Sequence, residues 1–200
     1  MTAMPGSAAP DDQPPGASDD DPNLPTPEWA PVEPLPSSEM FLRTFAGSQP
    51  VAATDILDPA FDLVDCRRQH RVALETLSRP SATAERMKAA AAELISARTD
   101  TEMLIMVIDE AVADRLLQQR KRGKSDVPPT SSVDSVLEVV VHTESVGEIA
   151  ARMADLWERL VDRASELDEL PEAHQLCELS AAYDHLAAEI ESGRRIPPGM

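Results

Sequence analysis

The 200-residue sequence contains few cysteines, few glycines and few aromatic or basic residues. Two cysteines, Cys66 and Cys177, are too few for a disulfide scaffold and share no metal-binding spacing, so we interpret both as buried small hydrophobic residues in a reducing cytosol. Seven glycines and six aromatic residues, beside abundant Ala, Leu, Val, Ile and Met, favour helices with aliphatic cores over a sheet.

Acidic residues outnumber basic ones by 36 to 18, giving a formal net charge of −18. A polyanion of this kind repels nucleic acid and anionic lipid, so we expect neither as a partner. The longest apolar runs fall far short of the roughly 20 residues that a membrane span requires. The first residues contain neither a basic stretch nor an apolar core, as a secretory signal would. We therefore expect a soluble, cytoplasmic protein.

Residues 1–37 form a separate region with ten of the 18 prolines, runs of aspartate and no Lys or Arg. Such a segment buries too little apolar surface to offset its ordering entropy, so we predict a disordered acidic tail. Trp29 stands alone among prolines, and a short docking motif there is the alternative to a passive tail. Residues 196–200 are also predicted to be disordered.

From residue 38 to 195, apolar residues recur at alternating spacings of three and four, which is the helical period. Pro80 separates two of the long periodic segments. Periodicity leaves open whether residues 131–141 are helical or extended. The predicted helices are about 38–46, 54–78, 82–119, 145–168 and 171–192, with a loop at 120–144.

These segments predict an all-α fold in which two antiparallel helical hairpins form a bundle or an elongated, coiled-coil-like domain. No paired Glu-x-x-His motif, zinc spacing, phosphate-binding glycine loop or nucleophile elbow is present, so we expect no metal and no cofactor. The basic residues near position 121 have no aromatic neighbours. Their expected partner is acidic, such as the chain's own aspartate-rich tail.

Three polar residues, Arg67, His70 and Arg98, occupy seam positions where apolar residues are expected. One interpretation is a polar layer that sets the register of the helices, with the arginines extending to water. The other is a pocket in which arginines bind an anion and a histidine moves a proton.

The stretch "HTESVGEIAARM" begins the third long helix. Ser145 and Glu148 form an S-x-x-E capping box, so the helix is predicted to begin there. Capping does not explain His142, Thr143 and Arg152, and Glu144 lies beside them. The candidate site therefore comprises His142, Thr143, Glu144, Arg152, His70, Arg67 and Arg98.

The same stretch resembles the His-Thr-Glu-Thr-Pro-Gly motif of bacterial domain-of-unknown-function family 4254. His142, Thr143, Glu144, Gly147, Ile149 and Arg152 match, whereas Val146 replaces the proline and Ala151 an aspartate. His70, the Ile-Asp pair of "MVIDEAVADRL" and the Gly-Arg-Arg at 193–195 are further similarities. The resemblance implies a divergent member of an all-α family with no assigned activity.

The sequence thus supports two functions. The first is a non-enzymatic interaction or assembly module that self-associates or binds a protein partner, in keeping with the long seams and the missing catalytic spacing. The alternative is a divergent enzyme or ligand-binding domain for an anionic or sugar-nucleotide-like small molecule.

Overall fold

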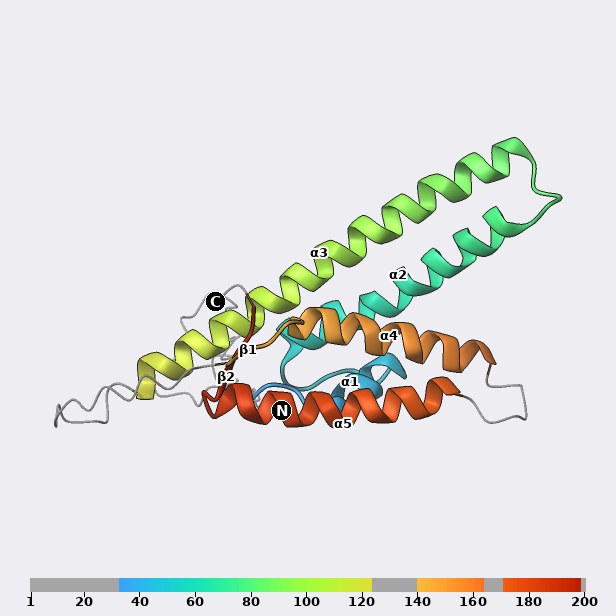
Figure 1. Ribbon diagram of the computed structural model, residues 1–200. Coiled ribbons are helices and arrows are strands. Elements are labelled where there is room, and N and C mark those ends of the chain that lie inside the picture. Colours follow the sequence, from blue (N-terminus) through green and yellow to red (C-terminus); the bar gives the residue numbers. More distant parts are fainter. Residues whose placement is uncertain (1–32, 124–139, 164–170, 199–200) are drawn as a thin grey trace, which may run out of the picture. The chain divides into compact units, whose positions relative to one another are not determined.

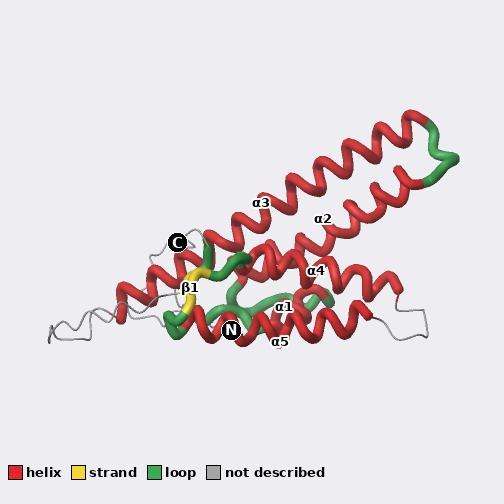
Figure 2. Tube along the Cα trace, viewed as in Figure 1, coloured by secondary structure: helices red, strands yellow, loops and turns green. Residues whose placement is uncertain are grey.

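The computed structural model describes residues 33–123, 140–163 and 171–198, which are built almost entirely from helices (Figure 1 and Figure 2). Within these ranges lie helices α1 (Ser38–Phe45), α2 (Thr54–Ser78), α3 (Ala84–Gly123), α4 (Val146–Arg163) and α5 (Pro171–Glu191), and strands β1 (Val140–Val141) and β2 (Arg195–Ile196).

Two antiparallel hairpins make up the described fold. α2 turns back after Ser78 into α3, and α4 packs along α5. α4 also contacts α2 and α3 and so joins the hairpins, while α1 packs against α2, α4 and α5. In Figure 1, the halves of α2 and α3 nearest their shared turn extend beyond the other helices. The predicted all-α class with two helical hairpins is confirmed.

The hydrophobic core lies where the hairpins meet. Phe41 and Tyr183 pack edge to face in it, with ring centroids 5.4 Å apart and ring planes at 88°, an arrangement that aromatic quadrupoles favour. α4 and α5 each bury one face against this core. The fully buried side chains include Ile56, Leu57, Leu63, Ile108, Val112, Val146 and Met153.

α5 buries only the face that carries Leu176, Tyr183 and Ile190. Cys177 follows Leu176 by one position, about 100° round the helix, and it is exposed. The expectation that Cys177 is buried is therefore wrong, whereas Cys66 is buried on α2.

The helix ends differ from the sequence analysis mainly in α3. α2 has the bounds predicted for it, 54–78, but α3 begins at Ala84 and continues to Gly123. Residues 120–123, predicted to start a loop, thus form the last turn of the helix. Its basic residues lie at the negative end of the helix dipole, which stabilises them there. Residues 164–168, predicted to continue α4, lie outside the described residues.

β1 and β2 pair in parallel, with Val140 opposite Arg195 and Val141 opposite Ile196. Val140 and Val141 are therefore extended, while residues 131–139 lie outside the described residues. Ile196 was predicted to belong to a disordered end of the chain, and that prediction is wrong. Its pairing is non-local, so no periodic pattern announces it.

Residues 33–37 were predicted to belong to the disordered tail, but they pack against the helices. Leu35 and Pro36 are buried. The Leu35 N–H donates to Glu191 Oε1 at 2.6 Å, and the Tyr183 hydroxyl donates to the Pro36 carbonyl at 2.7 Å. Proline lacks an N–H but keeps its carbonyl acceptor, so a proline-rich segment can still accept a hydrogen bond from a buried side chain such as Tyr183. The remainder of the predicted tail, including Trp29, lies outside the described residues.

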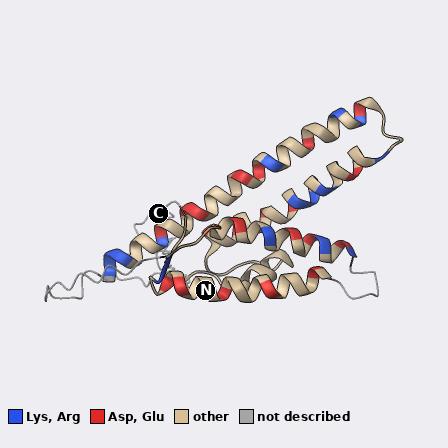
Figure 3. Cartoon of the chain, in the orientation of Figure 1, with Lys and Arg blue, Asp and Glu red and all other residues tan. Residues whose placement is uncertain are grey.

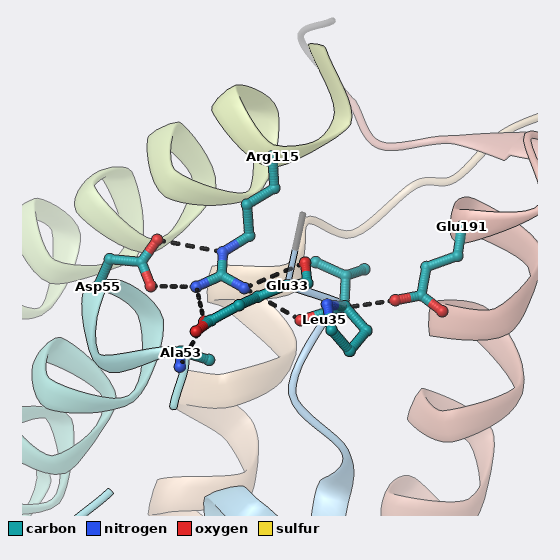
Figure 4. Close-up of polar contacts among 7 residues, drawn as sticks. Glu33, Leu35, Ala53, Asp55, Arg115 and Glu191 are labelled. Carbon is teal, nitrogen blue, oxygen red and sulfur yellow. Dashed lines mark hydrogen bonds and ion pairs between the residues drawn. The ribbon is translucent and has the colours of Figure 1, made fainter. Parts of the chain in front are cut away.

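Arg115 of α3 fastens this segment to α2 (Figure 4). Its guanidinium is bidentate to Asp55 and also binds Glu33 Oε2 at 3.2 Å and the Pro34 carbonyl at 3.0 Å. Burial alone would lower the pKa of Arg115, but the hydrogen bonds and charges of Asp55 and Glu33 outweigh burial and raise it. Glu33 also accepts the N–H of Ala53, a residue held at a left-handed φ of 52°.

Candidate functional site

The segment before α4 is first of all a helix entry. The Glu148 N–H donates to Ser145 Oγ at 3.1 Å, and the Ser145 N–H donates to Glu148 Oε2 at 2.7 Å. This is the reciprocal pattern of a capping box, which satisfies two amide groups left without helical partners.

Gly147 lies in the first turn of α4, where α4 crosses α3. Its N–H donates to Asp109 Oδ1 at 2.8 Å, and a Cβ at this position would lie 2.5 Å from the Ile105 carbonyl oxygen. Only glycine allows this approach. Burial raises the pKa of Asp109, although hydrogen bonds from Ser145 and Gly147 partly oppose the shift.

His142, Thr143 and Glu144 form a turn between β1 and α4. His142 Nδ1 lies 2.7 Å from the Glu144 carbonyl oxygen, and the His142 N–H donates to the Ile196 carbonyl at 3.1 Å. The Glu144 carboxylate receives two 2.8 Å contacts from Arg152 Nη1. His142 is thus held by the adjacent turn and by β2, Glu144 is held by Arg152, and Thr143 is exposed.

A cleft of about 570 Å³ opens beside α2, α4 and the beginning of α5. We call it the arginine cleft, because five arginines and one histidine line it together with three carboxylates. Figure 3 shows basic segments on both α2 and α4. The lining residues are Arg67, His70, Arg71, Leu74, Arg152, Asp155, Arg159, Asp162, Arg163 and Glu172.

Ion pairs connect the walls of the arginine cleft. Arg71 of α2 contacts Glu158 at 2.8 Å and Asp162 at 3.0 Å, both on α4. Arg163 of α4 contacts Glu172 of α5 at 3.0 Å. Glu158 is only 4% exposed, so its charge must be compensated by the arginines that reach it. These contacts fix α4 against α2 and α5.

Arg67 differs from the other arginines of the cleft. Its guanidinium forms no hydrogen bond or ion pair with any residue that the structure describes, and its Nε is buried without an acceptor. An arginine in this state retains donors that an incoming anion can use.

The structure brings only some of the predicted site residues together. Arg67, His70 and Arg152 line the arginine cleft, but His142, Thr143 and Glu144 do not, although Glu144 touches Arg152. Arg98 lies on the solvent side of α3, with its side chain 77% exposed and paired to Glu102.

Three arginines that line the cleft, Arg71, Arg159 and Arg163, were not among the predicted site residues. A signal was available: Arg71 follows Arg67 by four positions, and Arg159 and Arg163 follow Arg152 by seven and eleven. All three spacings keep side chains on one helix face.

A second surface of interest lies on the hairpin of α2 and α3. Its buried residues toward the turn include Ala73, Ala90, Ala97 and Thr101, all small. Small side chains let two helices approach but bury little apolar area. Several larger apolar residues of this hairpin are instead at least 40% exposed, among them Val72, Leu74, Met87, Ile95, Met103, Met106 and Val107.

No protein-family model, curated protein or solved structure matches the chain. None of the described helices combines the length and apolarity needed to cross a membrane. Within residues 33–123, 140–163 and 171–198, no group of three His, Cys, Asp or Glu side chains is placed to hold a metal ion.

Proposed function

We propose that the protein is an interaction and assembly module that joins a second copy of itself through the hairpin of α2 and α3. One observation carries this proposal: toward its turn the hairpin buries small side chains such as Ala90 and Ala97, while large apolar side chains of α3 remain exposed. Ile95, the most exposed of them on α3, retains 68% of its accessible surface, and Met106 retains 63%. Apolar surface gathered in this way is typical of an interface.

Energetics favour a reversible dimer. Covering Ile95, Met103 and Met106 gains about 1–2 kcal/mol for each side chain, given their present exposure. Association itself costs several kcal/mol in lost translational and rotational freedom. Counted over both copies, the gain is about 6–12 kcal/mol, and at its upper end it exceeds an association cost of about 4 kcal/mol by the roughly 8 kcal/mol of a micromolar dissociation constant.

Light scattering on the full chain tests this function. We expect the measured mass to move from that of one chain toward that of two as the concentration rises from about 1 to 100 μM, the range set by a micromolar affinity. A mass of one chain throughout would contradict the proposal.

A second function, binding of an anionic small molecule in the arginine cleft, is supported by the partnerless guanidinium of Arg67. Thermal unfolding with sodium pyrophosphate, against chloride at equal ionic strength, tests it. We expect pyrophosphate to raise the Tm of the wild type and of Arg98→Gln, an exposed control, but not of Arg67→Gln. Equal shifts in all three proteins would contradict it.

We further propose that the chain is a divergent relative of the bacterial family named above and works in the cytoplasm. The kinship is supported by the close approach of Gly147 to Ile105 and its hydrogen bond to Asp109, since both the glycine and the Ile-Asp pair belong to the similarity. The location is supported by two unpaired cysteines, Cys66 and Cys177. A structure of a family member in which the equivalent glycine and aspartate are not in contact would contradict the kinship.

A further inference from the structure

The face of α3 turned away from α2 carries seven exposed residues in one continuous stripe. α2 covers the opposite face, where Ala90, Ala97 and Ile108 are buried. Spacings of four, three, four, four, three and four keep the stripe on one side of the helix. We call it the α3 stripe: Lys88, Ala92, Ile95, Thr99, Met103, Met106 and Glu110.

The α3 stripe is symmetric about Thr99. Residues at equal distances before and after Thr99 are complementary, so an antiparallel copy places Lys88 against Glu110 and Ala92 against Met106. Ile95 then meets Met103, and Thr99 meets itself. Opposite charges face each other at both ends, and a small residue faces a large one beside them, as close packing of two helices requires.

We propose that two copies of the chain pair their α3 helices antiparallel about a two-fold axis at Thr99. This inference rests on the proposed assembly function and specifies its geometry. Such a contact is isologous, because each copy offers the same surface. The stripe is about 33 Å long, from 22 residue steps of helix.

A parallel pairing of the same stripe is unfavourable. It would set Lys88 against Lys88 and Glu110 against Glu110, so that both ends repel instead of attract. The centre accepts a dry contact in the antiparallel arrangement, because Thr99 Oγ1 already donates to the Ile95 carbonyl at 3.0 Å.

The stripe is accessible along its length. Ile95 is 68% exposed, Met103 51% and Met106 63%. Toward its end, Met106 and Glu110 border a hollow that Pro197 and Pro198 also line, yet Met106 keeps the exposure just given.

Charge exchange tests the register. We expect Lys88→Glu and Glu110→Lys each to weaken the dimer about tenfold, because two attractive pairs become repulsive. The double variant K88E/E110K restores the pairs and should return the dissociation constant to within about threefold of the wild type. Arg43→Glu, which makes the same change of net charge as K88E at an exposed side chain of α1, serves as the control and should leave the dissociation constant unchanged.

Cross-linking tests the axis. In a Cys177→Ser background, which removes the exposed native thiol, Thr99→Cys places two thiols face to face and should form a disulfide-linked dimer on mild oxidation. Ser96→Cys is the matched control. In the proposed pairing, the two residues at position 96 lie about 9 Å apart along the helix axes. This distance exceeds the roughly 7 Å between Cα atoms that a disulfide spans.

The outcomes separate this inference from the function beneath it. A dimer that K88E/E110K does not restore, or that is cross-linked in the Ser96→Cys variant but not in the Thr99→Cys variant, keeps the assembly function and overturns the register. A wild type that stays monomeric overturns both. Circular dichroism of each variant distinguishes lost pairing from lost folding, and recovery in the double variant cannot come from misfolded protein.

Discussion

The N–H of Gly147 donates to Asp109 Oδ1 at 2.8 Å, across 38 positions of sequence. This contact joins the first turn of α4 to α3 and therefore one hairpin to the other. It lies beside the approach of Gly147 to the Ile105 carbonyl, where no Cβ fits. The hairpins are consequently held at a crossing that depends on one small residue and one half-buried carboxylate.

Replacing Gly147 with alanine should destabilise the protein by about 3 kcal/mol, since the obstructing atom is backbone and cannot rotate away. Gly193→Ala is the control: its φ is 72°, but nothing lies within 4 Å of the added Cβ. There the cost should be only that of a left-handed alanine, about 1 kcal/mol. Urea unfolding of both variants measures the difference, and an equal or smaller loss in G147A would contradict the steric explanation.

Asp109 should make stability depend on pH. Its pKa is raised by burial above the ordinary value of 3.8, so the folded state binds the proton more tightly than the unfolded state. Its contribution is therefore fully present below pH 3.8 and is lost as the pH rises through the raised pKa.

The variant Asp109→Asn lacks this titration but keeps an acceptor for the Gly147 N–H. We expect the free energy of unfolding of the wild type, relative to D109N, to increase as the pH falls from about 7 toward 4. Urea titrations of the two proteins at several pH values measure it. A difference that stays constant, or that changes in the opposite sense, would refute this role of burial.

The parts of the fold that the sequence analysis predicted correctly have local causes. The capping box at Ser145 and Glu148 involves residues three positions apart, and the helical period of α2 is visible along the chain itself. The pairing of Val141 with Ile196 and the packing of Leu35 against α5 are contacts between distant segments. Composition suggested the opposite for Leu35, because prolines surround it.

The candidate site likewise combines features that are visible along the sequence with contacts between distant segments. Arg67 and His70 were predicted as site residues because they interrupt an apolar period, and Arg152 because capping does not explain it. Arg98 was predicted because it also interrupts an apolar period, although its side chain on α3 is exposed to solvent. Only the packing of α4 against α2 decides which arginines meet.

Arg115 should be a major source of stability, because it binds two carboxylates and two carbonyls from a buried position. We expect Arg115→Met to cost about 2–3 kcal/mol, less than for a fully buried pair because Asp55 and Glu33 can regain water. Arg43→Met, at an exposed arginine with one exposed partner, should cost under about 0.5 kcal/mol. Thermal and urea unfolding measure both, and similar losses in the two variants would contradict the assignment.

Arg71 and Glu158 should be energetically coupled. A double-mutant cycle with Arg71→Gln and Glu158→Gln should give a coupling of about 1–3 kcal/mol, because Glu158 is buried and Arg71 reaches it from another helix. The exposed pair Arg98 and Glu102 provides the matched cycle, for which we expect under about 0.5 kcal/mol. Equal coupling in the two cycles would show that Glu158 does not hold α4 to α2.

Sedimentation equilibrium of the full chain and two variants tests the assembly function most directly. Ile95→Glu places a charge in the α3 stripe, whereas Val161→Glu makes the same change at an exposed position of α4. We expect the wild type and V161E to form a dimer with a dissociation constant on the order of micromolar, and I95E to remain monomeric. A monomeric wild type at about 100 μM, far above that constant, or a dimer that I95E leaves intact, would contradict assembly through α3.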